Sequence, residues 1–190
     1  MTDIEKQPAR RQFIFSTLGL ALSGTAVALI AGKPRLALAA AADSKHAAGD
    51  VQILQTALSA EREAIAAYQL GADSGLLSKG VLGVAVTFQG HHKEHADVLS
   101  KTIASLGGKA AEAPAKYNFP TDKLKAERDV LEFAAGLERG AVSAYAGAIP
   151  LFDNRDLSKA AASILADEAM HWAVLRQALG LPPVPGAFFS

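Results

Sequence analysis

Apolar residues recur every three or four positions in four stretches of the chain, a spacing that predicts amphipathic helices. The first stretch begins at Asp50, which can cap a helix, and ends near Ala72. The second continues from Val81 until the glycine pair at 107–108. A short glycine- and serine-bearing turn at 71–80 separates them, so the two predicted helices should pack antiparallel.

The carboxyl-terminal half predicts a second pair of helices. Thr121 can cap the third helix, whose apolar stripe includes Leu131. Asn154 or Asp156 can cap the fourth helix, which should stop at Gly180. The link between these two helices is also short, so they should form a second antiparallel hairpin.

The segment 107–120 joins the two hairpins and contains Pro114 and Pro120. An extended segment of about 14 residues can span roughly 46 Å. A helix of about 20 residues is only roughly 30 Å long, so this segment can run the whole length of a bundle. The predicted fold is therefore all-α, a four-helix bundle with one long crossover between the second and third helices.

Ionisable side chains interrupt the apolar stripes where the four helices should face one another. Glu168 and His171 form a Glu-x-x-His pair, which places a carboxylate and an imidazole side by side, one helical turn apart. The segment His92-Lys-Glu-His95 turns two imidazoles inward with the same spacing. The candidate metal ligands are Glu61, His92, His95, Glu138, Glu168 and His171.

The two halves look like copies of one hairpin. The segment 61–68, Glu-Arg-Glu-Ala-Ile-Ala-Ala-Tyr, aligns without a gap on 138–145, Glu-Arg-Gly-Ala-Val-Ser-Ala-Tyr. His95 and His171 then follow at nearly the same offset in each half. An internal repeat of this kind predicts two hairpins related by pseudo-twofold symmetry.

A bound cation would explain why these groups share the core. An unpaired ionised carboxylate in an apolar interior costs several kcal/mol, or it must take up a proton. Carboxylate and imidazole ligands together suit iron, manganese or zinc, and the chain has no cysteine to favour a soft metal. Three carboxylates leave two divalent ions with uncompensated positive charge. Two ions, one tight and one weak ion, or a single ion all remain open.

Each polar residue near the predicted centre also has a simpler interpretation. His92 can be a hydrogen-bonded core histidine as readily as a ligand. Tyr68 and Tyr145 are most simply core aromatics, with a hydrogen bond or redox role beside the metal as the alternative. The remaining polar and aromatic residues lie off the stripe. We expect Glu63, Glu94 and Asp167 at the surface or behind the ligands. We expect His91 to be solvated and Trp172 to pack outward.

The amino terminus predicts a targeting segment. Arg10 and Arg11 precede a moderately apolar run rich in glycine, serine and threonine, and an Ala-x-Ala site ends at residue 39. This pattern resembles a twin-arginine export signal. An uncleaved membrane anchor is the alternative, because about 18 apolar residues can just cross a bilayer. Either interpretation places the rest of the chain in the periplasm or cell envelope.

Length and charge complete the outline. The 190 residues, half of them hydrophobic, suit a single domain with a sizeable core. The expected division is a signal peptide at 1–39, a linker at 40–49, the bundle at 50–180 and an irregular tail at 181–190. The first 39 residues hold five basic and two acidic side chains, leaving 14 of the 19 basic and 17 of the 19 acidic residues beyond them. That remainder offers no basic surface for nucleic acid.

The helices and their ligands resemble the ferritin-like di-iron carboxylate proteins, most closely bacterial exported ferritin-like domain proteins with a twin-arginine leader. In that family two lone glutamates join two Glu-x-x-His pairs in the core. The resemblance implies that Glu61 and Glu138 are the lone glutamates, and that His95 completes one pair. His92 stands where the family places that pair's glutamate, which commonly bridges two metals. A neutral imidazole has one free lone pair and cannot do this.

Two function classes follow from the resemblance. The first is a di-metal oxidoreductase with iron, or alternatively manganese or zinc, acting as a ferroxidase or on oxygen or peroxide in the cell envelope. The second is a non-catalytic bundle with a structural metal or none, acting in stress protection or interaction. The expected partners are metal ions, oxygen or peroxide, the twin-arginine translocase during export, and a second copy in a homodimer.

Overall fold

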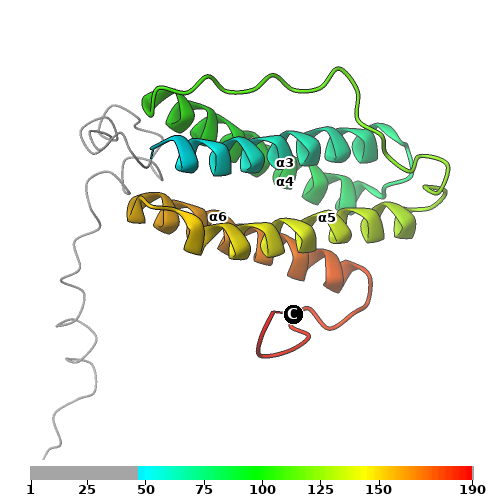
Figure 1. The fold of residues 1–190 in the computed structure, drawn as a ribbon. Helices are drawn as coiled ribbons and strands as arrows, with labels where there is room; N and C mark the ends of the chain where they lie inside the picture. Colours follow the sequence, from blue (N-terminus) through cyan, green and yellow to red (C-terminus); the bar gives the residue numbers. More distant parts are fainter. Residues whose placement is uncertain (1–46, 190) are drawn as a thin grey trace, which may run out of the picture.

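The computed structural model describes residues 47–189, which form four long α-helices and no strand. The helices are α3 (Ala47–Asp73), α4 (Lys79–Ser105), α5 (Glu127–Ala148) and α6 (Arg155–Ala178), with a 3-10 turn η3 (Ile149–Leu151) between the last two. They lie side by side as an elongated bundle (Figure 1). The all-α four-helix architecture is confirmed. The predicted signal at 1–39 and most of the linker lie outside the described residues.

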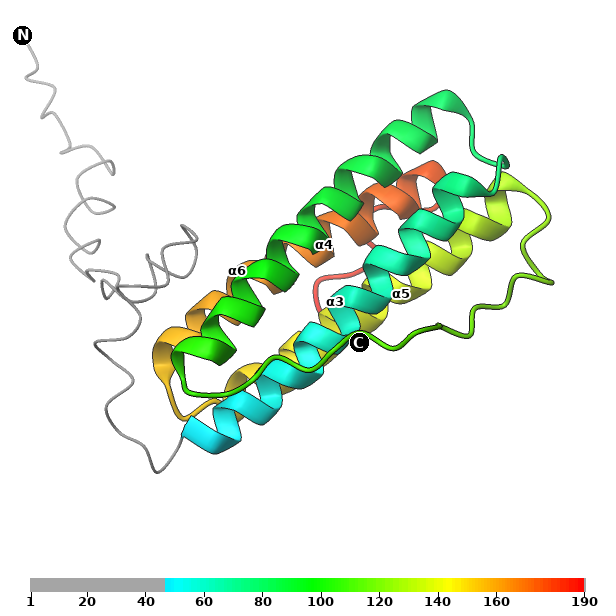
Figure 2. The same cartoon turned by 90° about the horizontal axis from the view of Figure 1, so that it is seen from above.

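The two hairpins meet along two faces of the bundle. Helix α3 packs along α4 and α5 packs along α6, while α3 also contacts α5 and α4 contacts α6. Both views place α3 and α5 on one side and α4 and α6 on the other (Figures 1 and 2). We call these sides the α3/α5 face and the α4/α6 face.

Apolar residues fill both ends of the bundle. One cluster gathers around Leu58 and Ile103, which are 1% and 0% exposed. The other gathers around Tyr68, Phe88 and Leu175. Burial of such side chains is the main favourable contribution to folding, so these clusters fix how the four helices meet. The layer between them holds the predicted metal ligands.

The crossover between α4 and α5 runs along α3 for the length of the bundle (Figure 2). Gln55 donates to the Lys109 carbonyl at 2.7 Å and accepts from the Ala111 amide at 2.9 Å. A Cβ on Gly108 would lie 2.9 Å from Cγ2 of Ile103, so only glycine fits this close approach. The crossover is therefore attached to the bundle at its start, after which it can span the remaining length as an extended chain.

Two predicted helix caps are wrong. Asp50 does not start the first helix, because α3 is already helical at Ala47 and Asp50 lies inside its first turn. Its buried carboxylate instead accepts from the amides of Asp153 and Asn154, at 2.9 and 3.1 Å. Asp50 thus ties the start of the first hairpin to the link within the second.

Thr121 does not cap the third helix, since α5 begins at Glu127. The residues after Thr121 form turns, and the carboxylate of Asp129 reaches back to accept from the amides of Lys125 and Ala126, both at 2.9 Å. An acidic side chain inside the first turn therefore replaces the expected hydroxyl at the cap.

The fourth helix begins and ends close to the predicted residues. The side chain of Asn154 accepts from the Asp156 amide at 2.9 Å, as an N-cap does. Gly180 has a φ of +73°, which suits the residue just beyond a helix end. The segment 181–189 is irregular. Among residues 47–189, none of the helices is both long and apolar enough to span a bilayer.

We expect Asp50→Ala to lower the free energy of unfolding by about 1–3 kcal/mol, because two backbone amides lose the buried carboxylate that accepts from them. Urea denaturation of the metal-free protein measures this. Asp73→Ala is the matched control, since Asp73 is exposed and accepts only from its helix neighbour Gln69. Equal stability of the Asp50 variant and the wild type would show that the link is held by other contacts.

Candidate metal centre

All six predicted ligands converge in the middle layer of the bundle. Each helix contributes at least one of them. The ligands face inward because they share the helical spacing of the apolar residues that line the core. Glu168 is 0% exposed, and four of the others are between 1% and 3% exposed. His95 is the least buried, at 15% of its side chain. The residues are Glu61 on α3, His92 and His95 on α4, Glu138 on α5, and Glu168 and His171 on α6.

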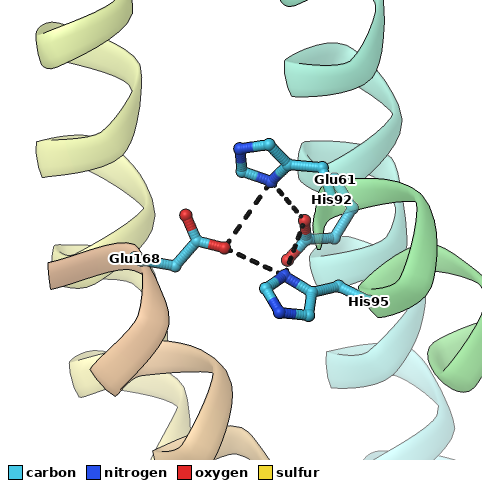
Figure 3. A group of neighbouring side chains, drawn as sticks. All are labelled: Glu61, His92, His95 and Glu168. Carbon is cyan, nitrogen blue, oxygen red and sulfur yellow. Dashed lines mark hydrogen bonds and ion pairs between the residues drawn. The ribbon is translucent and has the colours of Figure 1, made fainter. Parts of the chain in front are cut away.

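Glu61, His92, His95 and Glu168 form the first of two candidate ligand groups. Oε2 of Glu61 lies 2.8 Å from Nδ1 of His92 and 3.5 Å from Nδ1 of His95. Oε1 of Glu168 lies 3.6 and 3.1 Å from the same two nitrogens. The four atoms outline a closed ring (Figure 3). Ligands about 2.1 Å from a tetrahedral ion are separated by roughly 3.4 Å, so the ring has the size of a metal site.

His92, Glu138, Glu168 and His171 form the second group. Oε1 of Glu138 lies 3.3 Å from Nε2 of His92, and its Oε2 lies 3.5 Å from Nδ1 of His171. Oε2 of Glu168 is 3.7 Å from that same nitrogen of His171. Glu168 therefore faces both groups with different oxygens, as a bridging carboxylate would.

His92 also lies between the two groups. Its Nδ1 faces the first group and its Nε2 faces the second. The resemblance noted from the sequence implies a glutamate at this position of the chain. A neutral imidazole has one lone pair, so it can serve as a ligand in one group only. The two halves of the centre are consequently unequal.

Several buried atoms of the centre have no hydrogen-bond partner, although oppositely charged groups lie within 4 Å. They are Nδ1 of His95 and His171, both carboxylate oxygens of Glu168, and Oε2 of Glu138. Buried polar atoms are almost always hydrogen-bonded, so such a concentration needs an explanation. Every one of these atoms is a metal-ligand type, and a cation in either group would satisfy the atoms that face it. The residues present therefore fit a divalent metal.

Two tyrosines hold the lone glutamates across the bundle. Tyr68 of α3 donates to Oε1 of Glu138 on α5, and Tyr145 of α5 donates to Oε1 of Glu61 on α3 at 2.6 Å. Burial and the neighbouring glutamates raise the pKa of both phenols well above the ordinary value, so they stay protonated donors. Both tyrosines are thus buried core aromatics that also donate hydrogen bonds to candidate ligands. The sequence had offered these two roles as alternatives.

Charge in the metal-free centre is shared between glutamates and histidines. Burial raises the pKa of Glu61, but the facing imidazoles of His92 and His95 outweigh it and hold the pKa at about 2. Burial lowers the pKa of His92, yet Glu138 and Glu61 raise it to about 10. His95 and His171 are raised to about 9 in the same way. Protonated histidines therefore take the place of a metal's charge.

Glu168 differs from the other two glutamates. Burial raises its pKa, and the nearby imidazoles of His171 and His95 do not fully offset this. By contrast, His171 and His92 overcome burial at Glu138 and hold its pKa well below the usual range. Glu168 is thus the carboxylate that gains most from a cation.

Two neighbours of the centre lie off the inward stripes; for Asp167 the sequence left a position behind the ligands open, whereas for His91 it did not predict the contact. His91 was expected in solvent, yet its Nδ1 lies 3.0 Å from Oδ2 of Asp167 and 2.9 Å from Nε2 of His171. Oδ2 of Asp167 also lies 3.5 Å from Nε2 of His95. The four-residue spacing of Asp167 and His171 on one helix could have indicated this contact. Asp167 therefore lies behind two of the ligands, a position that orients imidazoles in metal sites.

The remaining off-stripe residues lie away from the ligands. Glu63 and Glu94 are exposed. Trp172 packs against Phe189 of the carboxyl-terminal tail, with ring centroids 5.7 Å apart, and the Arg176 guanidinium lies 5.0 Å from its ring centre. The tail therefore covers the tryptophan that directly follows a candidate ligand.

A cavity of 480 Å³ lies between α3 and α5 and reaches the centre. Glu61, His92 and Glu138 are its buried polar residues. The walls are apolar and built largely of small residues, among them Ala57, Ala60, Ala64, Gly136, Gly140 and Ala141. Small side chains let the helices stay close while leaving open space, so the α3/α5 face gives small apolar molecules a path to the ligands.

The fold and its buried carboxylate–histidine layer define a ferritin-like four-helix bundle. A family model of the ferritin-like domain matches residues 49–181. The chain therefore belongs to the ferritin-like domain family. No curated protein matches it in sequence.

Three solved structures share the fold. A conserved hypothetical protein from Mycobacterium tuberculosis has a TM-score of 0.66 and 22% identity, covering 76% of this chain and 99% of its own. A ferritin-like, diiron-carboxylate protein from Bacillus anthracis has a TM-score of 0.61 and 20% identity, covering 71% and 98%. The bacterioferritin-related protein of Bacteroides fragilis, a dodecameric thioferritin, has a TM-score of 0.60 and 24% identity, covering 75% and 89%.

Metal binding should release protons and tighten as the pH rises. Histidines with pKa values of about 9 to 10 are protonated at neutral pH, and each must lose its proton to act as a ligand. Glu61, with a pKa of about 2, stays ionised and contributes no such proton. We expect the apparent Mn²⁺ affinity to rise about tenfold per pH unit for each proton displaced.

Calorimetric titrations between pH 6 and 8, in two buffers with different ionisation enthalpies, count the protons released. The metal-free fold should show the opposite trend. Its histidines stabilise it fully below their ordinary pKa of 6.5, and this stabilisation is lost as the pH rises through 9 to 10. An Mn²⁺ affinity that is constant across this range would mean that the histidines are not the groups that bind.

Proposed function

We propose that this chain is an exported ferritin-like metalloprotein that binds iron or manganese and carries out redox chemistry on oxygen or peroxide in the cell envelope. The observation that carries the proposal is the set of buried, unpartnered ligand atoms from Glu138, Glu168, His95 and His171. The diiron-carboxylate bundle of Bacillus anthracis, which has the same fold, supports iron as the metal.

Bound iron would supply one-electron steps, so that two ferrous ions and two protons convert one hydrogen peroxide to two waters. Glu61, Glu138 and Glu168 would hold the cations, with Glu168 facing both halves of the centre. Tyr68 and Tyr145 would fix the lone glutamates in place. The reciprocal direction of these two hydrogen bonds also supports an internal repeat.

The cavity on the α3/α5 face suits a small, neutral reactant. Apart from the ligands, the charged residue among those that line it is Glu63, which is exposed. Dioxygen and hydrogen peroxide are small enough to pass between alanine and glycine side chains, whereas a hydrated anion would lose its water without compensation. The geometry therefore favours an oxidant that enters neutral.

A non-catalytic metal bundle is the second candidate, and His92 favours it. With a histidine where the family has a bridging glutamate, the two halves of the centre are unequal. A single ion, or one tight and one weak ion, would hold the helices together without pairing two metals for a two-electron reaction. Stress protection or interaction would then be the role.

Glu168→Gln tests the proposal, because it keeps the volume of the side chain and removes its charge. We expect metal content after ferrous loading to fall at least about tenfold, together with the rate of peroxide consumption. Metal analysis and a peroxide assay of the full chain measure both. Glu94→Gln is the matched control, since Glu94 is an exposed glutamate on α4.

The outcomes separate the two candidates. Unchanged metal content and peroxide consumption in Glu168→Gln would remove the proposed centre altogether. Metal that is bound by the wild type and lost in the variant, without any peroxide consumption by either protein, would select the non-catalytic bundle.

Export by the twin-arginine pathway is part of the proposal and is supported by the Arg10–Arg11 pair and the apolar run that follows. Replacing both arginines with lysine keeps the charge and removes the guanidinium groups. We expect the variant to accumulate inside the cytoplasm, as measured by cell fractionation and immunoblotting. Normal recovery of the double-lysine protein from the envelope would contradict this route.

A further inference from the structure

A further cluster of ligand atoms lies toward the α4/α6 face and shares one residue with the buried centre. It contains His91, Asp167 and His171. Nδ1 of His91 is 2.9 Å from Nε2 of His171 and 3.0 Å from Oδ2 of Asp167, and the last two atoms are 3.3 Å apart. The side chains of His91 and Asp167 are 41% and 23% exposed, so water and ions can reach the cluster.

Hydrogen bonds can account for only two sides of this triangle at a time. If both imidazoles donate to Oδ2 of Asp167, their two N–H groups lie 2.9 Å apart with no acceptor between them. If His91 donates to Nε2 of His171 instead, the lone pair of that nitrogen also faces Oδ2 of Asp167 at 3.3 Å. A cation at equal distance from the three atoms satisfies all of them. With bonds of about 2.1 Å, these separations give ligand–ion–ligand angles of roughly 90 to 105°. That range lies between octahedral and tetrahedral geometry.

The three side chains are two histidines and one carboxylate on a single face, a set that suits divalent first-row metals and leaves positions for water. His171 is held in orientation by Phe88, whose ring stacks on it with centroids 4.0 Å apart. The half-exposed side of the cluster supplies room for the water ligands.

His171 connects this cluster to the centre. Its Nε2 faces His91 and Asp167, whereas its Nδ1 faces Glu138 and Glu168 at 3.5 and 3.7 Å. A neutral imidazole has one lone pair, so His171 can bind an ion on one side at a time. An ion held at the outer cluster and an ion held by His171 in the centre therefore exclude each other.

We propose that His91, Asp167 and His171 form a solvent-facing site for divalent transition metals, and that ions pass through it into the centre from the α4/α6 face. This site goes beyond the redox role proposed above, because it requires only that the protein takes up a cation. Metal ions would thus enter through a polar face, while small neutral molecules reach the opposite, apolar α3/α5 face.

Trp172 makes the proposal measurable. It is the only tryptophan of the chain and directly follows His171. A paramagnetic ion such as Co²⁺ bound at the cluster quenches nearby tryptophan fluorescence, so stopped-flow mixing of the full-length protein with Co²⁺ gives the loading rate. Metal analysis after gel filtration gives the final content.

The first test is kinetic and uses His91→Gln. His91 is not a ligand of the buried centre, so the final Co²⁺ content of the centre should remain at the wild-type value. Loss of one outer ligand should weaken the outer site and slow loading by at least about tenfold. Asp167→Asn should slow it likewise, and Glu94→Gln should not. Wild-type loading rates in both the His91 and Asp167 variants would overturn the proposal.

The second test isolates the outer site. In Glu61→Gln/Glu138→Gln the centre loses two carboxylates, and His91, Asp167 and His171 are kept. We expect this variant, with its helix content checked by circular dichroism, to bind one Co²⁺, and to bind none when His91→Gln is added. No Co²⁺ in the double variant would overturn the outer site and leave the centre standing. Wild-type Co²⁺ content in the triple variant, which lacks the outer ligand and both carboxylates, would instead count against the centre.

Discussion

The structure depends on the burial of three carboxylates among helices that are otherwise apolar. Glu61, Glu138 and Glu168 lie in the middle layer, between two clusters of leucine, isoleucine and aromatic side chains. Ionised groups in such a place need opposite charge and hydrogen bonds, or the fold is destabilised by several kcal/mol. Protonated histidines supply that charge in the metal-free protein, and a cation would supply it when bound. The tyrosines and the packing of all four helices serve to hold this layer together.

His92 gives the centre its particular character. Its imidazole faces one half of the centre with each nitrogen, but it can act as a ligand in one half only. Glu168 then remains as the carboxylate that faces both halves. The two faces of the bundle also differ from each other. The α3/α5 face leads through small apolar residues to the ligands, and the α4/α6 face presents His91 and Asp167 to water. A site with separate polar and apolar approaches can take up an ion and a neutral molecule independently.

Much of this could be predicted from the sequence because helical periodicity is local. The three- and four-residue spacing that marked Glu61, Glu138 and His171 as inward is set by 3.6 residues per turn, whatever the helices later contact. Helix ends were less predictable, since several residues near an end can cap it. Thr121 had a suitable hydroxyl, but Asp129 lies inside the first turn and satisfies the amides from there. Asp50 had a suitable carboxylate, but a link far along the chain uses it.

The sequence by itself determined that four amphipathic helices form, that a long segment crosses between two hairpins, and that six metal-ligand side chains share their inward stripes. Only the tertiary structure decided which of these groups touch. Tyr68 reaches Glu138, and His91 reaches Asp167 and His171, across helices that are distant in sequence. Such contacts depend on how far each helix is rotated and shifted against its neighbours. That rotation is set by the packing of the whole apolar core, and no local pattern of residues encodes it.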